Sequence, residues 1–588
     1  MAEVSKSITA PDVQIETAEK DLYSLQSGSV SQIGESPPGI DAEVAQFFAE
    51  AQSSTRHIVI DDETNRRLRW MVHKRVLTVM VITYFAQTLD KGTINFASIM
   101  GIIPDNHLHG QQYAWLTTCV YIAILIWEFP TNRLLQRLPI AKYLAFNIAA
   151  WGVVLACTAA CSNFTGLVIV RTLLGVFECV CQPAFVFLST MWYTREEQAL
   201  VIGSFYSMNG FQQCVGGLIA YGIAHINTAK LKNWQILFTI LGCLTFVWGI
   251  FVAWYLPDSP MRARCFSPED RLLLAERVRK NDTGIQNKDF KVRLPAFKSS
   301  SGRVISTLIH AWLIIIARLV EALKDLTVWA IVLISFTNAL PTGGLGAFSN
   351  IILTEFGFSQ LQTYLLAIAQ GLIMPSIFAE LFVTVPRRYR EHTMPGVLLL
   401  SLLMFAFVKI MLFLFSAAYL SKKFNQRLLL AFIYTLPNIA GTIVFICVPA
   451  NPTTKVGLLI AFYCTQGFGA VAVLNLAVMS GNIAGRTKQV IASSLCFVAW
   501  AVGNAIGPQV FQDSDKPRYI RAFIVHLVVY GVQLATIAFL RLRLLRNNVL
   551  KARAQASEAN GDLSDSSAHK HAFDDLTDQE NPDFRYVY

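Results

Sequence analysis

Long apolar stretches separated by short polar segments dominate this chain, and their length is the first clue to its architecture. A helix that crosses a bilayer needs about 20 predominantly apolar residues. Stretches of that length recur from residue 74 to residue 542, which predicts an all-α integral membrane protein. We expect twelve spans, at residues 74–94, 112–134, 141–161, 163–190, 199–224, 234–256, 327–352, 360–384, 426–449, 455–480, 488–511 and 519–542.

Polar sequence at both ends and in the middle divides the chain into five parts. The end segments mix charge with serine and glutamine and contain no apolar signal-like run, which predicts disordered cytosolic tails. We therefore assign a disordered N-terminal tail (1–70), an N-terminal six-helix bundle (71–256), a cytosolic central loop (257–326), a C-terminal six-helix bundle (327–545) and a disordered C-terminal tail (546–588).

Composition and charge agree with a membrane protein and predict its orientation. Only 15% of the residues are charged, against about 25% in a typical soluble protein. The formal net charge is +10, but lysine and arginine gather in alternate connecting segments. By the positive-inside rule these segments are cytosolic, and so are both termini. The positive charge therefore indicates topology, and we expect no nucleic-acid partner.

Residues with the chemistry of enzymes or metal sites form no recognisable pattern. The eleven cysteines lie mostly within apolar stretches and lack metal-ligand spacing, so we interpret them as small core residues. We find no phosphate-binding loop and no activated nucleophile arrangement. The sequence thus predicts a protein that is not an enzyme and has no cofactor and no metal.

Ionisable residues inside the apolar stretches are the strongest sign of a functional site. Each costs roughly 2.5–3.5 kcal/mol near a helix centre, and such residues usually face a bundle interior or a water-filled pathway. Asp90 and Lys91 end the first stretch, where a position at the outer membrane interface is the alternative. Arg171 and Glu178 lie nearly two helical turns apart in the fourth stretch and share one helix face.

Nine motifs occur in order along the chain: LDKGTINFA (89–97), WEFPTNRLLQRLPIAKY (127–143), RTLLGVFE (171–178), MWYTREEQ (191–198), YSMNG (206–210), LPDSPMRAR (256–264), RVRKNDTGIQNKDFK (277–291), SGNIAGRTK (480–488) and GNAIGPQVF (503–511). With this ordered set the chain resembles the major facilitator superfamily, and within it the fungal allantoate permease family of anion:cation symporters.

The resemblance implies a fold and a transport function. The fold is two six-helix bundles, related by a pseudo-two-fold axis, around a site at the membrane midplane. The function is import of a small organic anion with protons, by alternating access, as a monomer in the plasma membrane. The family's substrates include ureides such as allantoate, vitamin-like carboxylates and small peptides. The expected partners are therefore the anion, protons and the lipid bilayer.

Within this family context, the buried charges become candidates for substrate binding and proton coupling: Asp90, Lys91, Arg171 and Glu178. The alternative for Arg171 is a structural clamp on backbone carbonyls. Further candidates for lining the site are polar residues within apolar spans: Tyr206, Asn209, Asn338 and Gln370. They can equally bond neighbouring helices, for about 0.6 kcal/mol each.

Gating residues and helix interruptions are predicted as well. We expect Glu128, Arg137 and Lys142 to act in gating, although Arg137 and Lys142 can equally be positive-inside anchors. Glycine and proline are predicted to interrupt the seventh span at 341–344 and the eleventh at 503–508, as hinges, site lining or packing positions.

The chain departs from the family pattern at three places. Val201 stands where relatives usually have an arginine, which leaves gating there open. Segments 301–320 and 385–415 carry extra apolar sequence, and we hypothesise that they are retained introns. The alternatives are interfacial helices and a fourteen-span variant. The competing functions are an exporting antiporter of metabolites or drugs, a nutrient sensor and an inactive paralogue.

Overall fold

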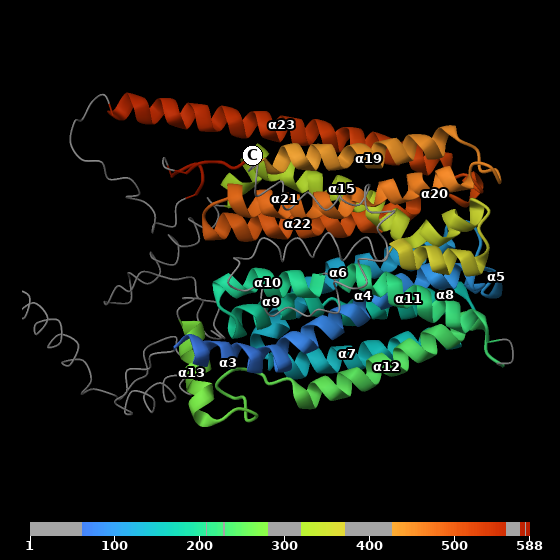
Figure 1. Ribbon diagram of the computed structural model, residues 1–588, viewed down its shortest axis with the longest axis horizontal. Helices are drawn as coiled ribbons and strands as arrows, with labels where there is room; N and C mark the ends of the chain where they lie inside the picture. The colour runs from blue at the N-terminus through green and yellow to red at the C-terminus, as the bar shows by residue number, and fades with distance from the viewer. Residues whose placement is uncertain are drawn as a thin grey trace, which may run out of the picture. The chain divides into compact units, whose positions relative to one another are not determined.

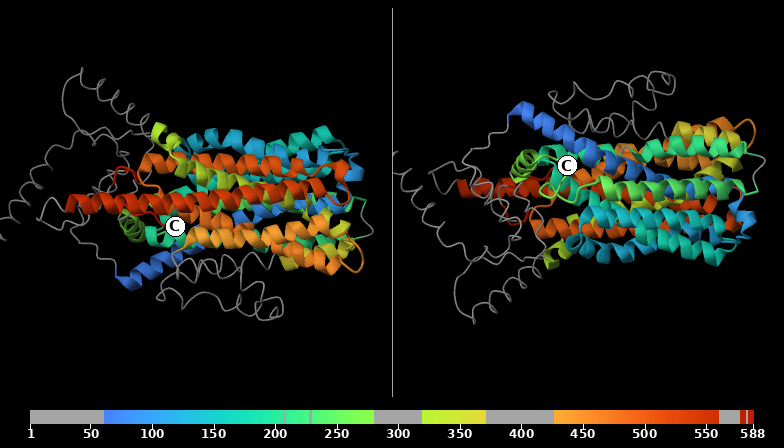
Figure 2. Two further views of the ribbon diagram at one scale, coloured as in Figure 1. Left: turned by 90° about the horizontal axis from the view of Figure 1, so that it is seen from above. Right: turned by 90° about the horizontal axis from the view of Figure 1, so that it is seen from below.

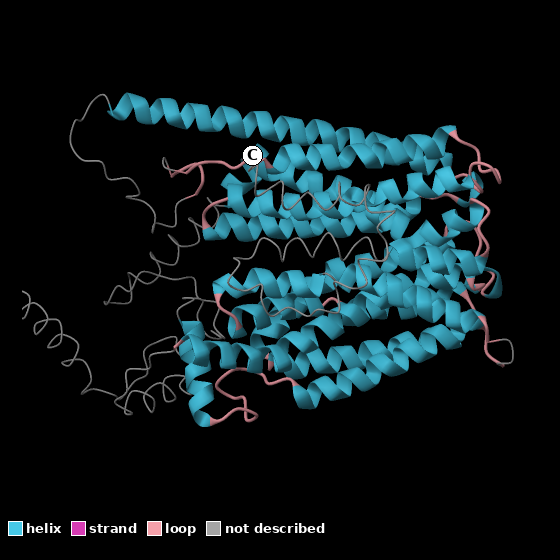
Figure 3. Cartoon of the chain, in the orientation of Figure 1, coloured by secondary structure: helices cyan, strands magenta, loops and turns pink. Residues whose placement is uncertain are grey.

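The described part of the chain consists of helices and their connections, without a β-strand (Figure 3). We describe it from a computed structural model. The structure describes residues 61–279 except 207 and 227–229, residues 319–370, residues 426–559, and residues 577–588 except 582 and 583. The predicted all-α class is confirmed.

The N-terminal bundle begins with one long helical pass. Helix α3 (Asp62–Val72) is capped by Asp61, which accepts a hydrogen bond from the Thr64 N–H at 3.2 Å. The pass continues through a π-helical turn, η1 (His73–Leu77), into α4 (Thr78–Ile99). Five further passes follow: α6 (Gln112–Arg137), α7 (Ile140–Cys157), α8 with α9 (Phe164–Glu178 and Cys181–Trp192), α10 with α11 (Arg195–Tyr206 and Met208–Ala224) and α12 (Asn233–Tyr255).

The C-terminal bundle repeats this arrangement after the short helix α13 (Pro268–Arg279). Its first pass is α15 (Leu326–Glu355), and residues 360–370 begin the second as a helix. The others are α19 (Arg427–Cys447), α20 with α21 (Lys455–Cys464 and Phe468–Asn482), α22 (Arg486–Ile506) and α23 (Ile520–Ala559). Among the described residues, nine helices are long and apolar enough to cross a membrane.

Successive passes run in opposite directions, so the bundles have two faces (Figures 1 and 2). We call the face with α3, α13 and the end of α23 the terminal face. The opposite one, with the short helix α5 (Ile102–Asp105) and residues 511–519, is the distal face. The connecting segments rich in lysine and arginine lie at the terminal face. These are the segments that we expect to be cytosolic.

Glycines allow two helix pairs to approach closely. A Cβ on Gly152 of α7 would lie 2.4 Å from the backbone nitrogen of Phe246 in α12. In the C-terminal bundle, a Cβ on Gly507, just past α22, would lie 2.3 Å from the Leu340 carbonyl oxygen of α15. Small residues at such contacts let helix backbones pack without side chains between them.

The seventh span is not interrupted as predicted. Helix α15 continues from Leu326 to Glu355 through Pro341, and Gly343 and Gly344 pack against Asn504 and Gly507. These glycines are therefore packing positions, because α22 leaves no room for a side chain. At the end of the eleventh span the α-helix changes to a 3₁₀ turn at Gly507–Val510.

The predicted tails also need correction. The first helix begins at Asp62, inside the predicted N-terminal tail. The last helix continues to Ala559, and residues 577–581 and 584–588 contact the C-terminal bundle. The C-terminal tail was predicted to be disordered because its overall composition is polar. That composition does not reveal that Tyr586 is buried and that Asn548 bonds its main chain. Segment 385–415 and all of 301–320 except residues 319 and 320 lie outside the described residues.

Candidate functional site

Asp90 and Lys91 lie well inside the helix bundle, in the C-terminal half of α4. The Asp90 side chain is buried at 1% exposure, and one of its oxygens, Oδ2, has no hydrogen-bond partner. The Lys91 side chain keeps 25% exposure. Its Nζ lies 3.6 Å from Oε2 of Glu178. The interfacial alternative therefore does not describe Asp90, which is enclosed by protein.

Helix α8 carries the other two charges on one buried face, as its spacing predicts. Asn163 starts the helix by accepting a hydrogen bond from the Gly166 N–H at 2.8 Å. Arg171 and Glu178 are both buried. Between them, a Cβ on Gly175 would lie 2.6 Å from the Val120 carbonyl, so α6 packs directly on α8 at this level.

The guanidinium of Arg171 is buried without a full set of partners. Its Cζ lies 5.1 Å from the ring centroid of Phe238, while Nε and Nη2 have no hydrogen-bond partner. A guanidinium has five donors in a planar fork that suits a carboxylate. In the structural-clamp alternative, backbone carbonyls would accept hydrogen bonds from these donors. Within the described part of the chain, no carbonyl does so at Nε or Nη2.

The four charges form one electrostatic group. Glu178 and Arg171 both act on Asp90, and Lys91 and Arg171 both act on Glu178. Two acids thus share a buried region with two bases. Buried charges are tolerated only when paired. A proton that binds to one of the acids, or an anion that binds to one of the bases, changes the charge balance of this group. The group can therefore respond to either ligand.

Two of the predicted site-lining residues contact each other and α4. Asn209 donates from Nδ2 to the hydroxyl of Tyr84 at 3.0 Å and to the Tyr206 carbonyl at 2.9 Å. The rings of Tyr84 and Tyr206 lie 5.4 Å apart. These contacts join α10 and α11 to α4.

The other two belong to the C-terminal bundle. Gln370 donates from Nε2 to Oε1 of Gln466 at 3.0 Å. Asn338 is buried in α15, and its Oδ1 has no hydrogen-bond partner. The amide oxygen of Gln370 is also unpaired and buried. Both side chains therefore keep acceptors to which a ligand or water can donate.

The predicted gating residues divide into two kinds. Glu128 is partly buried and within electrostatic range of Lys91. Arg137 and Lys142 are exposed at the terminal face. Near them, Asp258 accepts a hydrogen bond from the Ala141 N–H at 3.2 Å, which joins α7 to the end of the N-terminal bundle. The exposure of Arg137 and Lys142 agrees with the alternative that they are positive-inside anchors. Val201, the departure from the family, is buried in α10.

Residues that join the two bundles were missed by the sequence interpretation. Asn95 donates from Nδ2 to Ser349 Oγ at 2.6 Å, and its Oδ1 accepts from the Asn350 N–H at 3.1 Å. The Tyr113 hydroxyl donates to the Ala347 carbonyl at 2.8 Å. The available signal was Asn95, a polar residue within the motif LDKGTINFA, but its partners are more than 250 positions away.

A further pair of bundle contacts lies nearby. Thr118 of α6 donates to the Ala505 carbonyl at 2.7 Å and accepts from Gln509 Nε2 at 2.9 Å. All of these hydrogen bonds are in the half of the molecule toward the distal face, since they involve the end of α4, the start of α6, and the ends of α15 and α22.

Comparisons with known proteins agree with this architecture. The family model for the Major Facilitator Superfamily matches residues 80–508. The thiamine pathway transporter THI73 of Saccharomyces cerevisiae is 29% identical and covers 98% of each chain. The allantoate permease of the same yeast is 28% identical over 90% of this chain and 88% of its own.

Among solved structures, a bacterial homologue of the human lysosomal transporter Spinster, in an inward-facing and occupied conformation, superposes with a TM-score of 0.53. It covers 81% of this chain and 98% of its own at 13% identity, which supports the fold alone. The match to the family model spans most of the chain, both bundles included. This chain is therefore a membrane transporter that belongs to the Major Facilitator Superfamily.

Proposed function

We propose that this protein imports a small organic anion across the plasma membrane by proton symport, with both termini in the cytosol. The observation that carries the proposal is the buried group of Asp90, Lys91, Arg171 and Glu178, in which Arg171 keeps unpaired donors. The names of the allantoate permease and the thiamine pathway transporter support a small polar substrate.

The substrate anion binds near Arg171 in this proposal. Its Nε and Nη2 offer two neighbouring donors, and bidentate guanidinium–carboxylate pairs are short and strong. The ammonium of Lys91, which is partly exposed, attracts the anion into the bundle. Asn338 and Gln370 supply acceptors for donor groups on the substrate, such as the amides of a ureide.

The proton binds to one of the two buried carboxylates. A proton on Glu178 removes the charge that holds Lys91 at 3.6 Å, and a proton on Asp90 removes a charge that acts on Arg171. Either step frees a base to bind the anion. Proton and anion then enter together, since each compensates the charge of the other in a region where unpaired charge is costly.

Alternating access follows from the way the bundles meet. Asn95, Tyr113 and Thr118 join the bundles toward the distal face, which is the outer face under the positive-inside rule. This arrangement corresponds to a state with the outer side closed. In transport these bonds break as the bundles rock, and contacts form instead at the cytosolic side.

The experiment is uptake of a panel of labelled carboxylates by cells that lack their own permeases, with and without a protonophore. The panel contains allantoate, nicotinate, pantothenate and a dipeptide. We expect one of them to accumulate above its external concentration, and the protonophore to abolish that accumulation. Accumulation that survives collapse of the proton gradient contradicts symport. Proton-driven loss of substrate from preloaded cells indicates the exporter instead.

Two variants separate binding from coupling. Arg171→Ala is expected to abolish uptake while the protein still reaches the plasma membrane. Glu178→Gln keeps the shape of the side chain but cannot gain or lose a proton, so it is expected to exchange internal for external substrate without accumulating it. Asn147→Ala is the control, because Asn147 is buried but donates only to the Tyr143 carbonyl of its own helix. Normal transport by Arg171→Ala refutes the assigned binding site.

A further inference from the structure

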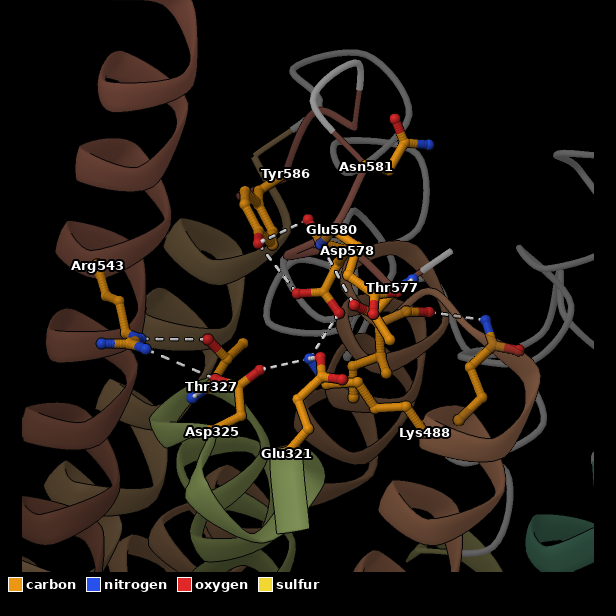
Figure 4. A network of polar contacts seen from close by, with 12 residues as sticks. Glu321, Asp325, Thr327, Lys488, Arg543, Thr577, Asp578, Glu580, Asn581 and Tyr586 are labelled. Carbon is orange, nitrogen blue, oxygen red and sulfur yellow. Dashed lines mark hydrogen bonds and ion pairs between the residues drawn. The ribbon is translucent and has the colours of Figure 1, made fainter. Parts of the chain in front are cut away.

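Residues 577–581 and 584–588 lie against the C-terminal bundle, and Figure 4 shows Asp578 and Tyr586 beside Lys488. Thr577 and Asp578 are buried, and Tyr586 is 5% exposed. A free polar tail would remain hydrated, so burial of a carboxylate and a tyrosine indicates specific docking. The helix α23 ends at Ala559, and the docked segment returns to meet its last turns.

Two asparagines of the bundle bind the main chain of this segment. Asn548 of α23 donates from Nδ2 to the Tyr586 carbonyl at 2.8 Å and accepts from the Tyr586 N–H at 2.9 Å. Asn482, at the end of α21, makes the same pair of bonds with the next residue, Val587, at 2.8 and 2.7 Å. The N–H of Arg427 donates to the main-chain oxygen of Tyr588 at 3.1 Å. Consecutive residues are thus held by different helices, and their main-chain groups are satisfied as they would be in a sheet.

A buried ammonium completes the docking site. Lys488, in the first turn of α22, has a fully buried side chain. Its Nζ lies 2.8 Å from Asp578, 2.8 Å from Asp325 and 3.2 Å from Glu321. The Tyr586 hydroxyl donates to Oδ2 of Asp578 at 2.9 Å. The docked segment therefore supplies one of three carboxylates around Lys488, and the segment that leads into α15 supplies the other two.

The segment also forms hydrogen bonds within itself and contacts a second lysine, in α23. Thr577 and Glu580 exchange hydrogen bonds at 3.0 and 3.3 Å in the pattern of a capping box. Lys551 of α23 donates to the carbonyls of Asp578 and Asn581, and its Nζ lies 5.3 Å from the ring centroid of Tyr586.

We propose that residues 577–581 and 584–588 form a strap that lies on the terminal face and holds the ends of α15, α21, α22 and α23 together as one body. The strap reaches α21 through Asn482 and α23 through Asn548. It reaches α22 through Lys488, which is bonded in turn to Asp325 at the start of α15. Rocking of one bundle against the other requires that each bundle move as a unit, and the strap contributes this rigidity at the end where the helices emerge.

The experiment is hydrogen–deuterium exchange on the purified full-length transporter, with peptide-level readout for residues 577–588 and for the first turns of α15 and α22. The variants are Asp578→Ala and the double variant Asn482→Ala/Asn548→Ala. Gln579→Ala is the matched control, because Gln579 is adjacent to Asp578 but exposed. In the wild type and the control, we expect the amides of residues 584–588 to exchange at least tenfold more slowly than in the free peptide.

Both strap variants are expected to lose that protection and to accelerate exchange in the first turns of α15 and α22, while α7 and α12 exchange as in the wild type. Unprotected amides in the wild-type segment overturn the docking. Loss of protection in the strap alone, with α15 and α22 unchanged, overturns its role in holding the helices together. If Asp578→Ala disturbs α7 and α12, Tyr586→Phe repeats the test with the loss of a single hydroxyl. The readout does not depend on substrate, so it is independent of the transport proposal.

Discussion

Replacement of Asn95 by alanine tests how the two bundles are held together toward the distal face. The substitution removes the side-chain bonds to Ser349 Oγ at 2.6 Å and to the Asn350 N–H at 3.1 Å. Hydrogen bonds between membrane helices contribute about 0.6 kcal/mol on average and about 1.7 kcal/mol at most. Loss of two such bonds therefore costs the present arrangement about 1–3 kcal/mol, which is about a 5- to 150-fold change in an equilibrium.

This cost applies only to the state in which the bundles meet at this level. In a state that is open toward the distal face, water bonds to the same groups, and the alanine costs nothing there. We therefore expect Asn95→Ala to shift the population toward the distally open state. The shift changes no substrate contact that we assign, because Asn95 bonds only the opposite bundle and its own helix.

Pulsed electron paramagnetic resonance between spin labels at positions 109 and 514 measures this shift. Both positions are exposed in distal connections, one in each bundle. The labels are coupled to unnatural amino acids, since the eleven native cysteines would otherwise react. Asn95→Ala is expected to enlarge the long-distance population, and the control Asn147→Ala is expected to leave it unchanged. An unchanged distribution in Asn95→Ala, or the same change in the control, refutes the reasoning.

Three further predictions concern stability, measured as the thermal midpoint of the detergent-solubilised protein. Gly507→Ala is expected to lower the midpoint by the equivalent of about 1–3 kcal/mol, because its Cβ would lie 2.3 Å from the Leu340 carbonyl. The control is Gly346→Ala, which has open space around it and is expected to leave the midpoint unchanged. Lys91→Ala removes one of the two bases that act on the buried Glu178, at a cost of about 1–3 kcal/mol. Adding Glu178→Gln is expected to restore most of this loss. A double variant no more stable than Lys91→Ala contradicts the pairing. Burial alone would raise the pKa of Asp325, but the hydrogen bond and charge of Lys488 and the bonds from Thr327 lower it below its ordinary value. The contribution of Asp325 to stability is therefore complete above about pH 4 and is lost as the pH falls through the lowered pKa. Asp325→Asn is expected to be less stable than the wild type at pH 7 and to lose less stability on acidification. An equal loss of stability in acid for both proteins counts against this.

Much of the helix arrangement could be predicted from the sequence because the bilayer imposes a length on every span. The stretches predicted at 112–134, 234–256 and 327–352 correspond to α6, α12 and α15 with only small differences at their ends. The same argument failed at the terminal face. Helices α3 and α23 extend beyond the apolar stretches, since hydrogen bonding continues a helix into water where the sequence allows it.

Part of the candidate site could be predicted as well. Arg171 and Glu178 share a face of α8 because helical spacing requires it, and their burial follows from the cost of charge in a membrane. Spacing did not predict that Lys91 pairs with Glu178, because that contact depends on how α4 and α8 rotate against each other. Nor did it predict that α15 continues past Pro341, since the packing of α22 against Gly343 and Gly344 decides this.

The sequence by itself thus determined the class of protein, most of the helices that are long and apolar enough to cross a membrane, and the burial of Asp90, Arg171 and Glu178. These properties depend on length, hydropathy and the cost of burying charge, all of which are local. Only the tertiary structure decided which distant groups meet: Asn95 with Ser349 and Asn350, Lys488 with Asp578, and Asn482 with Val587. Each of these contacts joins helices or segments far apart in the chain, and their relative rotation and depth come from the packing of the whole bundle.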